Sequence, residues 1–111
     1  MINFVQDGDI LTLAAPYAVA SGGGALVGTN IFGVATNDVA NGAVGEFKTT
    51  GVFNITALNT DTAAVGAIVY WDNTNKRITT TSAGNTKVGV VTAAKANGET
   101  FARVRLNGVF G

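Results

Sequence analysis

Short runs of strand-forming residues separated by glycine constrain this chain more than any other feature. Fifteen of its 111 residues are glycine and one is proline, while Val, Ile, Thr and Phe gather in runs of a few residues. Such runs are typical of β-strands, and glycine is typical of the turns between them. We therefore predict an all-β fold, a compact sandwich or closed barrel of about ten short strands. The predicted strands are Ile2–Val5, Ile10–Ala14, Tyr17–Ala20, Ala25–Val27, Ile31–Ala35, Val44–Thr49, Val52–Thr56, Ile68–Trp71, Arg77–Thr81, Lys87–Thr92 and Thr100–Leu106.

The order of residues also predicts one hairpin and an internal repeat. Residues 72–75, Asp-Asn-Thr-Asn, tolerate left-handed conformations and predict a hairpin turn. Residues 33–42 recur 56 positions later as residues 89–98 with six of ten positions identical, and weaker matches extend the repeat to residues 28–53 and 84–110. Two related halves of a single β domain, residues 1–111, explain this pattern. A turn pattern shared by glycine- and valine-rich segments, without duplication, explains it as well.

The chain has no histidine and no cysteine, which excludes most catalytic and metal-binding arrangements. Disulfides, thiolate or imidazole metal ligands, and nucleophiles activated by histidine are all ruled out. Asp7 and Asp9 form the only close pair of acids, and they flank Gly8 in a pattern typical of a turn. The glycine cluster at residues 21–29 lacks the lysine of a phosphate-binding loop. We predict that the protein is not an enzyme and has no cofactor or metal site.

Charge is scarce and balanced in this sequence. Charged residues make up 13% of the chain, with seven basic residues against seven acidic ones. This balance gives no electrostatic signature of nucleic-acid binding and predicts a nearly uncharged exterior suited to contact with another protein. The apolar runs are shorter than the roughly 20 residues that a membrane span needs, and the first residues lack the pattern of a secretory signal. We expect no nucleic-acid or membrane partner, and use in a cytoplasm.

The last predicted strand offers a candidate contact face. In an extended chain, Phe101, Arg103 and Arg105 share one face, while Ala102, Val104 and Leu106 share the other. The first set is a candidate interaction patch, although an ordinary solvated face has the same composition.

A second hypothesis comes from the aromatic residues. Tyr17, Tyr70, Trp71 and the Asn-rich turns suggest a carbohydrate- or ligand-binding β-module. Because Tyr70 and Trp71 are consecutive strand residues, they point to opposite faces, so at least one of them is expected in the core. A host-encoded oligomeric scaffold is a third possibility.

The order of the motifs resembles a known family of small phage proteins. The motifs are Phe4-Val5-Gln6-Asp7-Gly8-Asp9 with residues 10–16, then Ile31–Ala35, Thr50–Phe53, Gly66–Asp72, Lys76–Thr79, Val88–Val90 and Arg103–Gly108. In this order they resemble the head-decoration, or capsid cement, proteins of tailed phages along nearly the whole chain. The sequence departs from the family pattern at Asn54-Ile55-Thr56 and at the terminal Val109-Phe110-Gly111.

This resemblance implies a β-rich virion protein that binds the exterior of the capsid and stabilises it. In a phage, the alternative carbohydrate- or ligand-binding β-module would belong to a tail or baseplate. It implies the major capsid protein as partner, a homo-oligomer (dimer or trimer), and assembly in the host cytoplasm. The candidate interface residues are Ile2, Phe4, Val5, Phe101, Arg103, Arg105 and Phe110.

Overall fold

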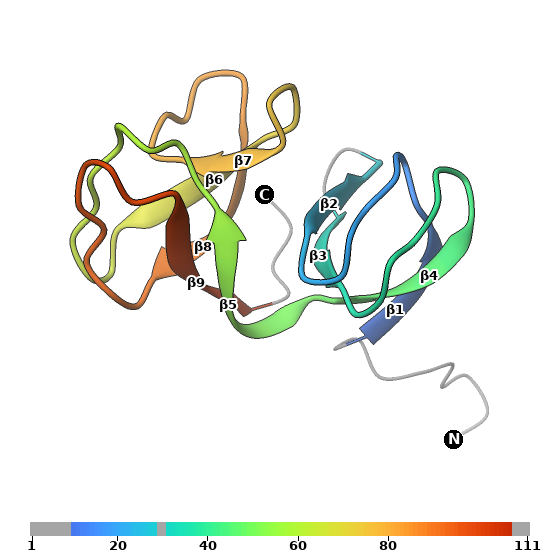
Figure 1. Ribbon diagram of the computed structural model, residues 1–111. Helices are drawn as coiled ribbons and strands as arrows, with labels where there is room; N and C mark the ends of the chain where they lie inside the picture. The colour runs from blue at the N-terminus through green and yellow to red at the C-terminus, as the bar shows by residue number, and fades with distance from the viewer. Residues whose placement is uncertain (1–9, 29–30, 108–111) are drawn as a thin grey trace.

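The computed structural model describes residues 10–28 and 31–107, and these residues form two β-sheets, one in each half of the chain (Figure 1). The first sheet has the strand order β1-β4-β3-β2, and the second has the order β5-β9-β8-β6-β7. We call residues 10–48 the first half and residues 50–107 the second half. The strands are β1 (Ile10–Ala14), β2 (Gly24–Val27), β3 (Ile31–Ala35), β4 (Val44–Lys48), β5 (Thr50–Thr56), β6 (Ile68–Asp72), β7 (Arg77–Thr79), β8 (Thr86–Val91) and β9 (Phe101–Asn107).

The all-β prediction is confirmed, and all pairings between these strands are antiparallel. The second sheet curls until its end strands meet, because Ala57 after β5 forms a bridge with Ile78 of β7, and the Leu58 amide donates to the Ile78 carbonyl at 2.9 Å. The first sheet stays open, with β1 and β2 as its edges. Among the described residues, no helix is long and apolar enough to cross a membrane.

One predicted strand is wrong and another lies outside the described residues. In the predicted strand Tyr17–Ala20, only Val19 pairs, through a single bridge to Val39. The chain bends at Pro16 and turns again at Gly22, so the straight segment between them is too short for a ladder. The predicted strand Ile2–Val5 falls within residues 1–9, which are not described.

The loops that connect the strands share one local conformation. Four of them contain an Ala-x-Gly turn in which the glycine has a φ between +80° and +100°, namely Gly22, Gly42, Gly66 and Gly98. In each turn, the residue after the glycine donates its amide to the alanine carbonyl, at 2.8 to 3.2 Å. Within each half the two loops form a bridge, Val19 with Val39 and Ala63 with Lys95. Both halves are therefore built on similar loop pairs, while a duplication of one domain stays a prediction.

The hydrophobic core joins the two halves. Phe32 of β3 and Trp71 of β6 belong to one buried cluster, with ring centroids 5.0 Å apart and ring planes at 50°. Gly24 of β2 lies against both rings, since a Cβ at this position would come within 2.7 Å of Phe32 and 3.0 Å of Trp71. The close approach of β2 therefore depends on a residue without a side chain.

The predicted hairpin turn at residues 72–75 is confirmed between β6 and β7. The Asp72 carboxylate accepts hydrogen bonds from the amides of Thr74 (3.0 Å) and Asn75 (3.1 Å) and from the Asn75 side chain (2.8 Å). The left-handed residue is Lys76, with a φ of +57°, rather than one of the asparagines. Its ammonium lies 4.3 Å above the Tyr17 ring, so the hairpin reaches the first half.

Candidate functional site

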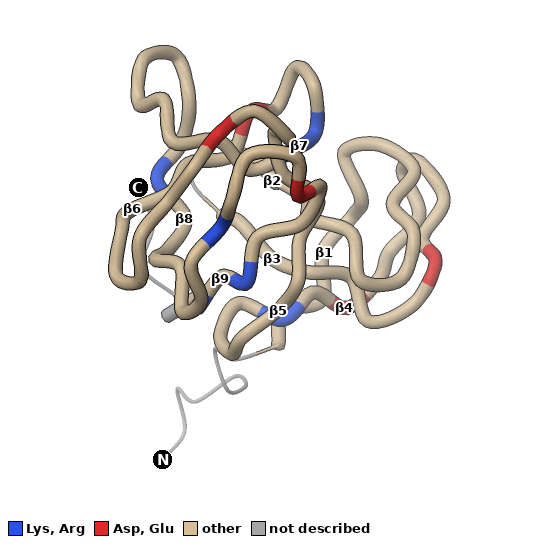
Figure 2. Tube along the Cα trace, turned by 60° about the vertical axis from the view of Figure 1, so that its left-hand side comes forward, with Lys and Arg blue, Asp and Glu red and all other residues tan. Residues whose placement is uncertain are grey.

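The outer row of β9 carries the aromatic and basic side chains that the sequence placed on one face. Phe101, Arg103 and Arg105 are exposed, and the alternate residues Ala102, Val104 and Leu106 are at most 3% exposed. The alternation follows because the inner row must fill the core, while no other part of residues 10–28 and 31–107 covers the outer row. Figure 2 shows how few charged positions the fold carries, with basic residues on β9 among them.

Aliphatic side chains surround this outer row. Ile68 of β6, Val90 of β8, Arg105 of β9 and Val52 of β5 lie opposite one another in register, and so form a row across four strands. Ile68 is 48% exposed, Val52 is 53% exposed and Phe101 is 57% exposed. An arginine set among exposed aliphatic and aromatic side chains has the composition of an energetically important protein contact. We call Val52, Ile68, Phe101, Arg103 and Arg105 the β9 face.

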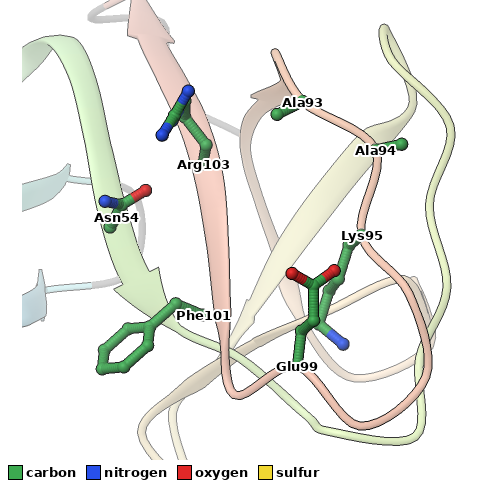
Figure 3. A pocket seen from close by; sticks show the side chains of 7 residues that line it. All are labelled: Asn54, Ala93, Ala94, Lys95, Glu99, Phe101 and Arg103. Atoms are coloured by element: carbon green, nitrogen blue, oxygen red, sulfur yellow. The ribbon is translucent and has the colours of Figure 1, made fainter.

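A groove opens beside β9 where β8 turns away from it. Val91 is the last residue of β8 to lie opposite β9, and the Thr92 amide donates to the Arg103 carbonyl at 2.9 Å. Continued pairing would bring Ala94 opposite Phe101, but within the described ranges no backbone hydrogen bond joins these two residues. The groove has a volume of about 370 Å³ and is lined by Asn54, Ala93, Ala94, Lys95, Glu99, Phe101 and Arg103 (Figure 3).

The Phe101 backbone faces this groove. The Ala57 amide donates to the Thr100 carbonyl at 2.8 Å, so residues 57 and 100 form a hydrogen-bonded pair of the β5–β9 ladder. Pair types alternate along an antiparallel ladder, so Thr56–Phe101, Asn54–Arg103 and Val52–Arg105 are non-hydrogen-bonded pairs. The N–H and C=O groups of Phe101 therefore point away from β5 toward the groove.

The charged groups at this site have different surroundings. Glu99 accepts a hydrogen bond from the Ala96 amide at 2.6 Å, which holds its carboxylate at the loop side of the groove (Figure 3). Lys95 is 6% exposed, and its ammonium donates to the Asp61 carbonyl at 2.7 Å. In the part of the chain that the structure describes, the guanidinium groups of Arg103 and Arg105 have neither an ion pair nor a hydrogen bond. These two arginines are the cations that the β9 face offers to a partner.

Asp61 links the loop after β5 to the end of β7 through hydrogen bonds. Its carboxylate accepts hydrogen bonds from the Thr79 hydroxyl at 2.8 Å and the Thr80 amide at 2.9 Å. Partial burial raises the pKa of Asp61, but these hydrogen bonds and the Lys95 ammonium outweigh it, so the pKa lies below its ordinary value. Asp61 is therefore a structural carboxylate.

The aromatic residues behind the carbohydrate hypothesis do not form an open platform. Trp71 is 2% exposed, and its indole N–H donates to the Asn73 side chain at 3.1 Å. The Tyr17 hydroxyl donates to the Gly24 carbonyl at 3.1 Å, and Lys76 covers the ring. Burial also raises the pKa of Tyr17 above its ordinary value. As expected from the alternation of strand residues, Trp71 is in the core, while Tyr70 is half-buried on the other face.

Four of the candidate interface residues, Ile2, Phe4, Val5 and Phe110, lie outside the described residues, as do Asp7 and Asp9. Their roles stay predictions, and so does the interface role of the β9 face. The described ranges contain no group of three or more acidic residues that could hold a metal ion. The groove itself was not predicted. Its one signal in the sequence is a difference in length between the repeats, which have eight residues at 43–50 and nine at 99–107.

Comparison with known families decides the broader assignment. A family model described as phage cement protein matches residues 5–106. The chain belongs to the phage cement protein family. It is therefore a structural protein of the bacteriophage virion, associated with the capsid. No curated protein and no solved structure gives a match.

Proposed function

We propose that this cement protein sits on the outer surface of the capsid, binds the major capsid protein and reinforces the shell as a homo-oligomer assembled in the host cytoplasm. Its role is binding, not catalysis, and it needs no cofactor. A standard protein interface buries about 1,600 Å², and many copies act together on one shell, so moderate individual affinities suffice.

The observation that carries this proposal is the β9 face. Phe101 is a large apolar side chain left 57% exposed, next to two arginines without partners among the described residues. Aromatic and arginine side chains dominate the binding energy of protein interfaces, particularly where aliphatic neighbours exclude water. The first nine residues, with Ile2, Phe4 and Val5, and Phe110 near the other end, complete the proposed contact set.

The test compares phage heads that lack the protein with heads to which it has been added back. Heads carrying the protein should withstand heating and chelation better than bare heads. The variant Phe101→Asp should bind heads less, because it removes the apolar anchor of the β9 face. Val44→Asp is the matched control, since Val44 is 69% exposed but lies on β4 in the first sheet. Equal survival of bare and complete heads would contradict the cementing role.

A further inference from the structure

The outer row of β9 and the residues that precede β1 have complementary sequences. Phe101, Arg103 and Arg105 are two residues apart from one another and lie on one exposed face. Val5, Asp7 and Asp9 have the same spacing in the chain. In an extended segment such residues share a face and repeat every 7 Å or so, so an apolar-acid-acid row can lie opposite an aromatic-base-base row.

We infer that the N-terminal segment, residues 1–9, of a second copy of this chain docks along β9, with Asp7 and Asp9 paired to Arg103 and Arg105. This inference rests on the proposed function and deepens it, because it assigns the β9 face and residues 1–9 to the contact between copies. Their effect on head binding then comes through the homo-oligomer. Each copy supplies one segment and one face, so exchange of segments links copies together.

Charge sets the direction of the docked segment. Glu99 lies in the groove at the Phe101 end of β9, while Arg105 lies toward the other end. An antiparallel segment would bring Asp9 toward the Glu99 carboxylate, which is unfavourable. A parallel segment brings Val5 to Phe101, Asp7 to Arg103 and Asp9 to Arg105. The apolar residue then meets the aromatic ring, and each aspartate meets an arginine.

The groove would receive the apolar residues at the start of the docked segment. It lies beside Phe101, at the end of β9 that the apolar residues ahead of Asp7 approach. Ala93 and Ala94 leave room there for larger side chains. The Phe101 N–H and C=O groups have no backbone partner among the described residues, so they are available to an extended chain. Charge pairing along the β9 face and apolar contact in the groove thus act on one continuous segment.

The free energy gained on docking depends on whether the two arginines already have partners. Among the described residues they have none. Arg103 and Arg105 are exposed, so pairing them breaks no existing ion pair. Two neighbouring charge pairs mainly add specificity and direction, and the apolar contacts supply affinity.

The test is charge reversal in the full-length protein, read by light scattering after size exclusion at low salt. Face reversal, Arg103→Glu with Arg105→Glu, and segment reversal, Asp7→Arg with Asp9→Arg, should each weaken association roughly a hundredfold, because like charges then face each other. Each variant alone should elute near the 11.2 kDa of one chain. The chain carrying all four substitutions should associate again.

Mixing the two reversed variants separates docking between copies from docking within one chain. In an equimolar mixture each segment meets a face of opposite charge on the other variant, so oligomers should return. The control variant, Lys76→Glu with Lys87→Glu, makes the same change in net charge as face reversal, at residues of the β6–β7 hairpin and of β8 that are not part of the β9 face. It should associate like the wild type. Thermal unfolding of each variant verifies that it is folded.

Several outcomes would overturn the inference: a monomeric wild type, undiminished association of either reversed variant, or a four-substitution chain that stays monomeric while folded. Recovery in that chain without recovery on mixing would overturn the assignment to a second copy. Because these measurements need no phage heads, they leave capsid binding and the cementing role to a separate test. A monomeric wild type would contradict only the homo-oligomer part of the proposed function. A protein that oligomerises as described yet gives heads no protection contradicts the cementing role alone.

Discussion

Lys95 and Asp61 are joined by a 2.7 Å hydrogen bond from the buried lysine ammonium to the aspartate carbonyl. In the first half the loop position that corresponds to Lys95 is Val39, which is 7% exposed. The second half thus uses a charged side chain where the first half uses an apolar one.

This difference predicts how the second half responds to substitution at Lys95. Lys95→Met should leave the free energy of unfolding within about 1 kcal/mol of the wild type, because the lost hydrogen bond is offset by the relieved burial of a charge. Lys95→Ala should cost about 2–3 kcal/mol, because it also removes the buried stem. Urea denaturation measures both values, and equal losses for the two variants would contradict the argument.

Asp61 predicts a pH dependence of stability. Its pKa in the folded protein lies below that of the unfolded chain, about 3.9. The stabilisation is therefore fully present above pH 4 or so and is lost as the pH falls through the lower folded value. Asp61→Asn should flatten the stability profile below about pH 4. Asp72 has a pKa lowered mainly by hydrogen bonds from Asn75, so it keeps a residual slope in that variant.

Gly24 predicts a steric effect at the contact between the halves. Gly24→Ala should destabilise the protein by about 1–3 kcal/mol, because the added methyl group meets the rings of Phe32 and Trp71. Trp71→Ala should cost about 3–5 kcal/mol by opening a cavity in the shared core. Combining Gly24→Ala with Phe32→Leu should recover part of the first loss, and chemical denaturation would show whether it does.

Gly42 tests the backbone conformation of the shared turn, because a side chain at this position would not clash with a neighbouring atom. A Cβ at Gly42 meets nothing within 4 Å, but its φ is +80°. Gly42→Ala should therefore cost about 1 kcal/mol through backbone conformation alone, and Gly42→Asn should cost less, because asparagine tolerates left-handed conformations better. Equal melting temperatures for the two variants would argue against a conformational origin.

The sequence predicted local structure better than the arrangement of the halves. The strands at Ile10–Ala14 and Ile31–Ala35, the hairpin turn at residue 72 and the alternation along β9 depend on neighbours in the chain, so periodicity and turn residues reveal them. Tyr17–Ala20 has strand-forming residues, but the turns on either side limit its pairing. Local propensity alone does not contain that limit.

The groove and the buried lysine could not be predicted for a related reason. The groove exists because β8 leaves β9 after Val91, and this depends on where the loop bridge of Ala63 and Lys95 draws the chain. A lone lysine in a sequence predicts an exposed side chain, and its burial here depends on a carbonyl 34 residues away. Both features follow from contacts between distant segments.

Strands β4 and β5 are separated only by Thr49, so one nearly continuous ribbon belongs to both sheets (Figure 1). A force that pulls the two halves apart would run along this ribbon. All seven residue pairs that hold β5 against β9 would then have to slide at once, because a load along a strand is shared by its whole ladder. Peeling the strands from one end would break the same bonds one after another. A protein built in this way resists tension along the segment that joins its two sheets.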